Sequence, residues 1–182
     1  MIDIVHRPSV FRRFRRDRRG VSAVEFALLA PLMITLYLGS TEISDGVGAT
    51  RKVSLTAATV ANLTAQEATI TAAQMTTILN ASAAVIAPYD ASKLKIVVSG
   101  LKIDATGKAT VDWSRTKNGA VRATNSTVTI PAALAVPNSY LVLSEVSFAY
   151  TPIVGHTITG TINLSDKMYM SPRQSLTITV TS

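Results

Sequence analysis

The chain has 182 residues, a net charge of +7 and a mean hydropathy of +0.30, and 47% of its residues are hydrophobic although only 5% are aromatic. This length allows one domain with accessory segments. The sequence contains no cysteine, which excludes disulfides, thiolate catalysis and zinc–thiolate sites.

Positive charge is concentrated at the start of the chain. Residues 1–20 contain seven arginines against Asp3 and Asp17, a charge of +5, whereas the remaining residues contain 11 basic and 9 acidic groups, a charge of +2. A basic block ahead of an apolar segment keeps that end of the chain in the cytoplasm. We therefore predict a flexible cytoplasmic leader over 1–20. The expected topology signal consists of Arg12, Arg13, Arg15, Arg16, Arg18 and Arg19.

An apolar run follows the leader immediately. Residues 21–41 carry a single charge, that of Glu25. As a helix, this run would extend roughly 31 Å, about the thickness of the hydrocarbon core of a bilayer. We predict a transmembrane helix over 21–41, in contact with membrane lipid, with the rest of the chain on the far side of the membrane.

Glu25 makes this predicted span unusual. A carboxylate inside an apolar span costs about 2.5–3.5 kcal/mol unless it has a partner, and ionisable groups in such positions are usually functional. If the chain were cut between Gly20 and Val21, the new amino group of Val21 would lie one helical turn from Glu25. The amino group of a neighbouring copy could approach the same carboxylate in a bundle of such helices. Cleavage would thus create the missing cation.

The sequence around Gly20 resembles the processing site of type IV prepilins. Gly20 closes a short basic leader, and Glu25 is followed by an aromatic residue, Phe26, ahead of an apolar helix, which is most similar to the Flp/Tad branch of these pilins. The chain as a whole is similar to the TadE/TadG-like pilus-assembly proteins, or pseudopilins. The stretches that carry this resemblance are RRGVSAVEFALLAP, NLTAQEATITAAQMTTILNAS, VDWS, LSEVSFAYTP and YMSPR.

The resemblance implies a minor pilin or pseudopilin of a Flp/Tad-type pilus. Such a protein crosses the bacterial inner membrane once, with its C-terminal domain in the periplasm or incorporated in the pilus. A prepilin peptidase would cut after Gly20 with Phe26 as the recognition aromatic, and Glu25 would serve helix packing during assembly. The partners implied are inner-membrane lipid, the peptidase, other pilins and pseudopilins, and pilus assembly proteins.

Small and polar residues follow the span, and we assign 42–88 to a helical segment. Gly46 and Gly48 predict a bend or a frayed turn before the helix resumes. Thr71 followed by Gln74 is a capping-box pattern that begins a second helix, which Pro88 ends. The apolar stripe of the first helix consists of Val53, Ala57, Val60 and Thr64, and that of the second consists of Met75, Ile78, Leu79, Ser82, Val85 and Ile86.

From residue 93 the hydrophobic period changes to two, and we predict an extracytoplasmic antiparallel β domain over 89–182 because no helical crossover separates the strands. Residues 94–99 and 109–114 should form a hairpin around a turn at 104–107, with Ala109, Val111 and Trp113 on one face. A short strand is expected at 127–130 and a central one at 140–150, with Glu145 on its opposite face. Three further candidates are 158–164, 168–170 and 176–180. The predicted fold class is α+β and pilin-like.

The sequence offers no constellation of residues for catalysis. His6 and His156 are too far apart in the chain to suggest a ligand pair, and Asp104 and Asp112 lack the spacing of an EF-hand. No serine lies in a G-x-S-x-G elbow, and no glycine-rich phosphate loop is visible. We predict a protein that is not an enzyme and that uses no cofactor, metal, small-molecule substrate or nucleic acid.

Two alternatives share the apolar segment but not the processing after Gly20. The first is an uncleaved single-pass membrane protein whose outer domain binds an extracytoplasmic partner. The second is a secreted protein whose signal peptide is removed after Ala49, although Glu42 and Asp45 lie between the apolar run and that position. The mature chain would begin at Val21, Met1 or Thr50 in the three cases.

Overall fold

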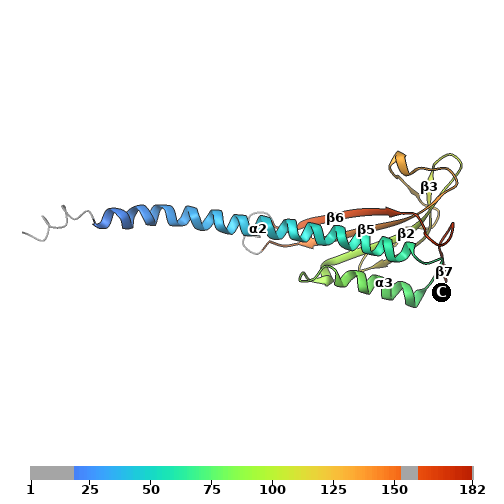
Figure 1. Ribbon diagram of the computed structural model, residues 1–182, viewed down its shortest axis with the longest axis horizontal. Coiled ribbons are helices and arrows are strands. Elements are labelled where there is room, and N and C mark those ends of the chain that lie inside the picture. The colour runs from blue at the N-terminus through green and yellow to red at the C-terminus, as the bar shows by residue number, and fades with distance from the viewer. Residues whose placement is uncertain (1–18, 153–159, 182) are drawn as a thin grey trace, which may run out of the picture. The chain divides into compact units, whose positions relative to one another are not determined.

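The computed structural model describes residues 19–152 and 160–181 (Figure 1). The chain divides into two units, 1–41 and 42–182, and each is described by itself. The second unit combines helices with an antiparallel β-sheet, which confirms the predicted α+β class. Residues 1–18 of the predicted leader, His156 and the first part of the strand expected at 158–164 lie outside the described residues.

The first helix, α2, is a single element of 47 residues, Arg19–Ala65. The bend or frayed turn expected at Gly46 and Gly48 is wrong, because both glycines lie within the helix. Tertiary contacts explain the difference. The rings of Tyr89 and Tyr150 approach α2 at these two positions, so packing compensates for the low helix propensity of glycine.

The second helix, α3 (Ala72–Ala84), begins as predicted. Gln74 N donates to Thr71 Oγ1 over 3.2 Å, and Thr71 N donates to Gln74 Oε1 over 2.8 Å, so the capping box is confirmed. The helix buries Met75, Leu79 and Ser82 from the predicted face. It ends at Ala84, before Pro88, and a 3-10 turn, η1 (Ala91–Lys93), leads into the sheet.

Five strands form an antiparallel sheet in the order β4-β3-β2-β5-β6. The predicted hairpin is confirmed, and its turn is held by Asp104 Oδ1, which accepts from the backbone nitrogens of Thr106 and Lys108. β5 lies in the interior between β2 and β6, as expected of the strand with the most aromatic face. The bounds are β2 Leu94–Ile103, β3 Ala109–Lys117, β4 Thr127–Val128, β5 Tyr140–Tyr150 and β6 Ile162–Met170, with a 3-10 turn, η2 (Ala132–Leu134), before β5.

The predicted common face for Ala109, Val111 and Trp113 is wrong. In the pairing of β3 with β2, Trp113 is opposite Gly100 and Val111 is opposite Leu101, so Asp112 is an extra, bulged residue. The bulge reverses the alternation of side chains along β3. Trp113 therefore joins one core cluster, while Ala109 and Val111 join another on the opposite face of the sheet.

The C-terminal strands also differ from the expectation. The two candidates at 158–164 and 168–170 are parts of one strand, β6, as far as the described residues go. The last strand, β7 (Thr179–Thr181), pairs with β1 (Thr69–Thr71) in a separate two-stranded sheet, and this pairing is parallel. Trp113 Nε1 donates to the carbonyl of Ile178 over 2.8 Å, which fixes the chain just before β7.

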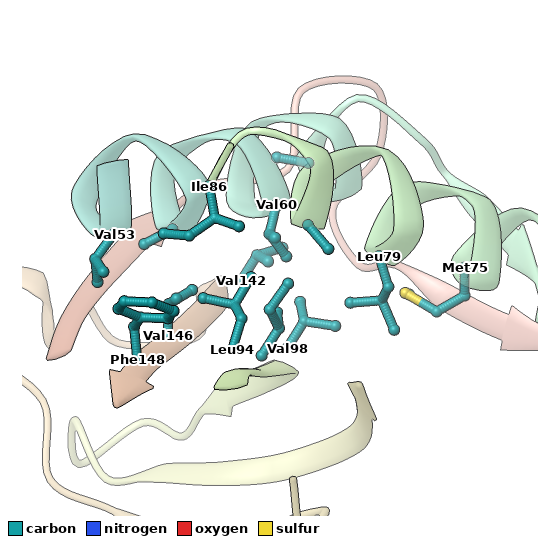
Figure 2. Close-up of a cluster of buried hydrophobic side chains, with 14 of the residues drawn as sticks. Val53, Val60, Met75, Leu79, Ile86, Leu94, Val98, Val142, Val146 and Phe148 are labelled. Carbon is teal, nitrogen blue, oxygen red and sulfur yellow. The ribbon is translucent and has the colours of Figure 1, made fainter. Parts of the chain in front are cut away.

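The main core lies between the two helices and one face of the five-stranded sheet. Figure 2 shows Val53 and Val60 of α2 and Met75 and Leu79 of α3 directed toward the strands. The strand side of this cluster consists of Leu94, Val98, Val142, Val146 and Phe148. All four predicted stripe residues of α2 are buried, so the second half of the helix is confirmed as a packing element.

Candidate processing and assembly site

The predicted site residues lie in the first two turns of α2. Gly20, Val21, Glu25 and Phe26 are all exposed, with exposed fractions of 54% for Val21 and 69% for Phe26. Arg19 is the first residue of the helix. The other arginines of the topology signal, Arg12, Arg13, Arg15, Arg16 and Arg18, lie outside the described residues.

The helix brings Val21 and Glu25 onto one face. At 3.6 residues per turn, residues four apart differ by about 40° around the axis, whereas Phe26 points about 100° away from Glu25. The carboxylate and the backbone nitrogen of Val21 therefore lie along the same side of α2. The aromatic ring occupies the adjacent side and leaves the carboxylate accessible.

Glu25 makes no hydrogen bond or ion pair with any residue in 19–152 or 160–181. Its neighbours one turn away are Val21, Ser22, Leu28 and Leu29, and only Ser22 has a side chain that can donate. Chemically, this carboxylate is an acceptor whose neighbours one turn away are apolar except for Ser22. An ammonium group would form a charge-assisted hydrogen bond with it and offset the cost of keeping it in an apolar setting.

Large apolar side chains cover the first half of α2. Its most apolar 18-residue window has a mean hydropathy of 1.9, and none of the window is buried, so the helix is long and apolar enough to cross a membrane. These side chains include Leu28, Leu32, Met33, Ile34, Leu36 and Tyr37, all more than half exposed. Exposed apolar side chains in such number require a lipid or protein environment.

Two groupings in the β domain are not predicted by the sequence. Glu145 accepts from Arg122 Nε and Nη2 over 2.6 and 2.8 Å and pairs with Lys167 Nζ at 2.9 Å, which ties the segment after β3 to the sheet. An aromatic cavity also forms beside Asp45. The cavity had one signal in the sequence: Gly46 and Gly48 lie in a segment with helical periodicity.

The fold and the exposed helix define a class of protein: an α+β domain that follows, within the described residues, one helix able to span a membrane. Within this class, residues 20–74 match the family described as TadE-like protein. The match confirms the predicted resemblance to TadE-like proteins over these residues. That family is not a family of enzymes. No curated protein and no solved structure matches the chain.

Proposed function

We propose that this protein is a minor pilin or pseudopilin of a Flp/Tad-type pilus, processed after Gly20. The exposed carboxylate of Glu25, one turn from Val21 on an apolar helix, is the observation that carries the proposal. The TadE-like match supports it, because the matched residues begin at Gly20 and include the whole apolar half of α2.

The charges of the leader and of Glu25 suggest an order for insertion, cleavage and assembly. The arginine-rich leader keeps the N-terminus in the cytoplasm while the apolar half of α2 enters the inner membrane. A membrane peptidase cuts between Gly20 and Val21 and removes the leader. Glu25 then accepts a hydrogen bond from the amino group of Val21 of its own or a neighbouring chain, which lowers the cost of bundling these helices with other pilins. The β domain faces the periplasm or the pilus surface.

The intact mass of the protein extracted from membranes tests the processing step. We expect a mature chain that begins at Val21, and we expect the Gly20→Val variant to keep its leader, because a β-branched side chain replaces hydrogen beside the bond that is cut. A wild-type chain that still begins at Met1 would contradict the processing.

The Glu25→Ala variant tests the assembly step. We expect membrane insertion at least equal to that of wild type, because a charge leaves the span, and incorporation into sheared pili reduced at least about tenfold, which corresponds to about 1.4 kcal/mol. The matched control is Glu67→Gln, which removes an exposed carboxylate of the outer domain and should leave incorporation unchanged. Normal incorporation of Glu25→Ala would overturn the assembly role.

An uncleaved single-pass protein is the second candidate, and one observation favours it. α2 includes Arg19 and Gly20, so the Gly20–Val21 bond lies in a helical turn that a peptidase must first unwind. Glycine weakens that turn by about 1 kcal/mol relative to alanine, which makes unwinding less costly.

Removal of a signal peptide after Ala49 is opposed by the packing. Ala49 is fully buried within α2 and belongs to the main core cluster. A chain beginning at Thr50 would lose Asp45 and Gly48, against which Tyr89 packs.

A further inference from the structure

A cavity of about 150 Å³ opens on the domain beside the first turns that follow the apolar run. Its principal lining residues are Asp45, Tyr89, Asp90, Lys93, Phe148 and Tyr150. They come from α2, from the loop and 3-10 turn before β2, and from the end of β5. Three separate segments of the chain thus converge on one small space.

Aromatic rings form the walls of this cavity. The Tyr89 ring lies 5.8 Å from the Phe148 ring at an interplanar angle of 56°, and 6.2 Å from the Tyr150 ring at 81°. The Tyr89 hydroxyl donates to the carbonyl of Asp45 over 3.0 Å, which fixes the ring against α2. The rings are therefore held in place before any ligand arrives.

Gly46 and Gly48 lie beside these rings, and Gly48 leaves room for the Tyr89 hydroxyl. A Cβ at Gly48 would lie 3.2 Å from the Tyr89 hydroxyl, and a Cβ at Gly46 would lie 3.9 Å from the Tyr150 ring. Glycine inside a helix costs about 1 kcal/mol relative to alanine. Close packing of Tyr89 thus accounts for glycine at Gly48, whereas the distance at Gly46 is an ordinary contact, and neither glycine breaks the helix.

The charges around the cavity are mixed, with an acidic excess. Asp45 and Asp90 supply two carboxylates and Lys93 one ammonium. Asp90 is held in position because it accepts from Ser92 N over 2.9 Å. Burial, followed by the charge of Asp45, raises the pKa of Tyr89, so the phenol stays neutral at physiological pH. Neutral rings beside carboxylates attract organic cations, while Lys93 attracts an anion.

The cavity includes a residue that is close in the chain to the predicted span. Asp45 follows residue 41, the last residue of that span, by four residues. Tyrosine is enriched at membrane interfaces because its ring is apolar and its hydroxyl polar. A zwitterion that carries an ammonium and a phosphate matches this lining, because the rings and Asp45 suit the ammonium and Lys93 suits the phosphate.

We propose that this cavity binds a phosphoethanolamine group. The ammonium lies against the rings of Tyr89 and Tyr150 and pairs with Asp45, and the phosphate pairs with Lys93. This goes beyond the proposed role in a pilus, because it requires neither cleavage after Gly20 nor assembly with other pilins. The headgroup of a membrane lipid and free phosphoethanolamine share this chemistry.

Carbon-13 labelling of the tyrosine rings provides the test. The chain has five tyrosines, of which Tyr140 and Tyr169 lie outside the cavity and serve as internal references. The full chain is placed in nanodiscs of phosphatidylglycerol alone or with phosphatidylethanolamine. We expect the ring signals of Tyr89 and Tyr150 to shift only when the ethanolamine lipid is present.

Titration with soluble compounds distinguishes the two sources. In phosphatidylglycerol discs, free phosphoethanolamine should produce the same shifts. Shifts with the free compound but not with the lipid would assign a soluble ligand to the same site. No shift of Tyr89 and Tyr150 with either source, or equal shifts in discs that lack ethanolamine, would overturn the proposal.

Substitutions separate the two charges of the ligand. Asp45→Asn should weaken binding of phosphoethanolamine and of ethanolamine, each by about fivefold or more, whereas Lys93→Gln should weaken only phosphoethanolamine. Glu67→Gln is the matched control and should change neither affinity. Unchanged signals of Tyr140 and Tyr169 verify that the variants remain folded. Unaltered affinity in both cavity variants would also overturn the proposal.

Discussion

The two halves of α2 have the same secondary structure and opposite surroundings. Residues 20–41 expose large side chains such as Phe26, Leu28 and Leu36, each at least 65% exposed. Residues 42–65 bury a stripe of small ones, among which Val53, Ala57 and Val60 are at most 1% exposed. The helix continues through both halves without a break.

The difference shows how side-chain size separates two uses of one helix. Alanine and valine let the axis of the second half approach the sheet closely, so the domain packs against it at interior density. Leucine, phenylalanine and methionine in the first half project beyond the backbone and offer apolar area to lipid or to other helices.

An alanine-to-leucine exchange in each half tests this contrast most strongly. Ala57→Leu should lower the free energy of unfolding of the domain by about 2–3 kcal/mol, because the buried position has no room for three more carbons. Ala27→Leu, at an exposed position, should change it by less than about 0.5 kcal/mol. Fluorescence of Trp113, the single tryptophan, reports denaturant unfolding in nanodiscs. Equal effects in the two halves would remove the distinction.

The next comparison is between two carboxylates, Glu145 of the β domain and Glu25 of the apolar half of α2. Burial raises the pKa of Glu145, but hydrogen bonds from Arg122 and Lys167 outweigh it and hold the pKa below its ordinary value of 4.5. A depressed pKa stabilises the fold above pH 4.5, and this contribution is lost as the pH falls further through the folded-state pKa. Domain stability should therefore decrease on acidification below pH 4.5.

Glu145→Gln should lower the free energy of unfolding at pH 7 by about 1–2 kcal/mol, because charged hydrogen bonds are lost, and should flatten its acid dependence. Glu25→Gln should leave the unfolding of the domain unchanged at every pH. Denaturant titrations at pH 7, 4.5 and 3 measure both variants. If the stability of the Glu145→Gln variant still decreases in acid to the same extent, the decrease comes from carboxylates other than Glu145. Asp90 and Asp104 are such groups, because local hydrogen bonds also lower their pKa values.

Three glycines of α2 give the smallest effects. Gly46→Ala should stabilise the domain by about 0.5–1 kcal/mol, because the added methyl meets the Tyr150 ring at an ordinary contact distance of 3.9 Å. Gly48→Ala should gain less, since its methyl would lie 3.2 Å from the Tyr89 hydroxyl. Gly39→Ala meets nothing within 4 Å and should leave domain unfolding unchanged. Thermal unfolding monitored at Trp113 ranks the three, and a larger gain at Gly48 than at Gly46 would contradict the close packing of Tyr89.

Patterns that depend on neighbours in the chain were predictable. The capping box of Thr71 and Gln74 and the turn at Asp104 use backbone groups two to four residues away, so their residue types reveal them. The bulge at Asp112 was not predictable, because it depends on the pairing of β3 with β2 and on space for the Trp113 ring beside Gly100. The parallel pairing of β1 with β7 joins segments more than 100 residues apart, which no local pattern encodes.

By itself, the sequence determined the apolar run with Glu25 one turn from Val21, the position of the arginine-rich block and the α+β order of elements, since each depends on composition or on short-range periodicity. Only the tertiary structure decided that α2 continues through Gly46 and Gly48, that Trp113 faces the helices, and that Asp45 meets Tyr89 and Tyr150 around a cavity. The physical reason is that these features arise where distant segments pack together, and packing there overrides the local preferences of the residues.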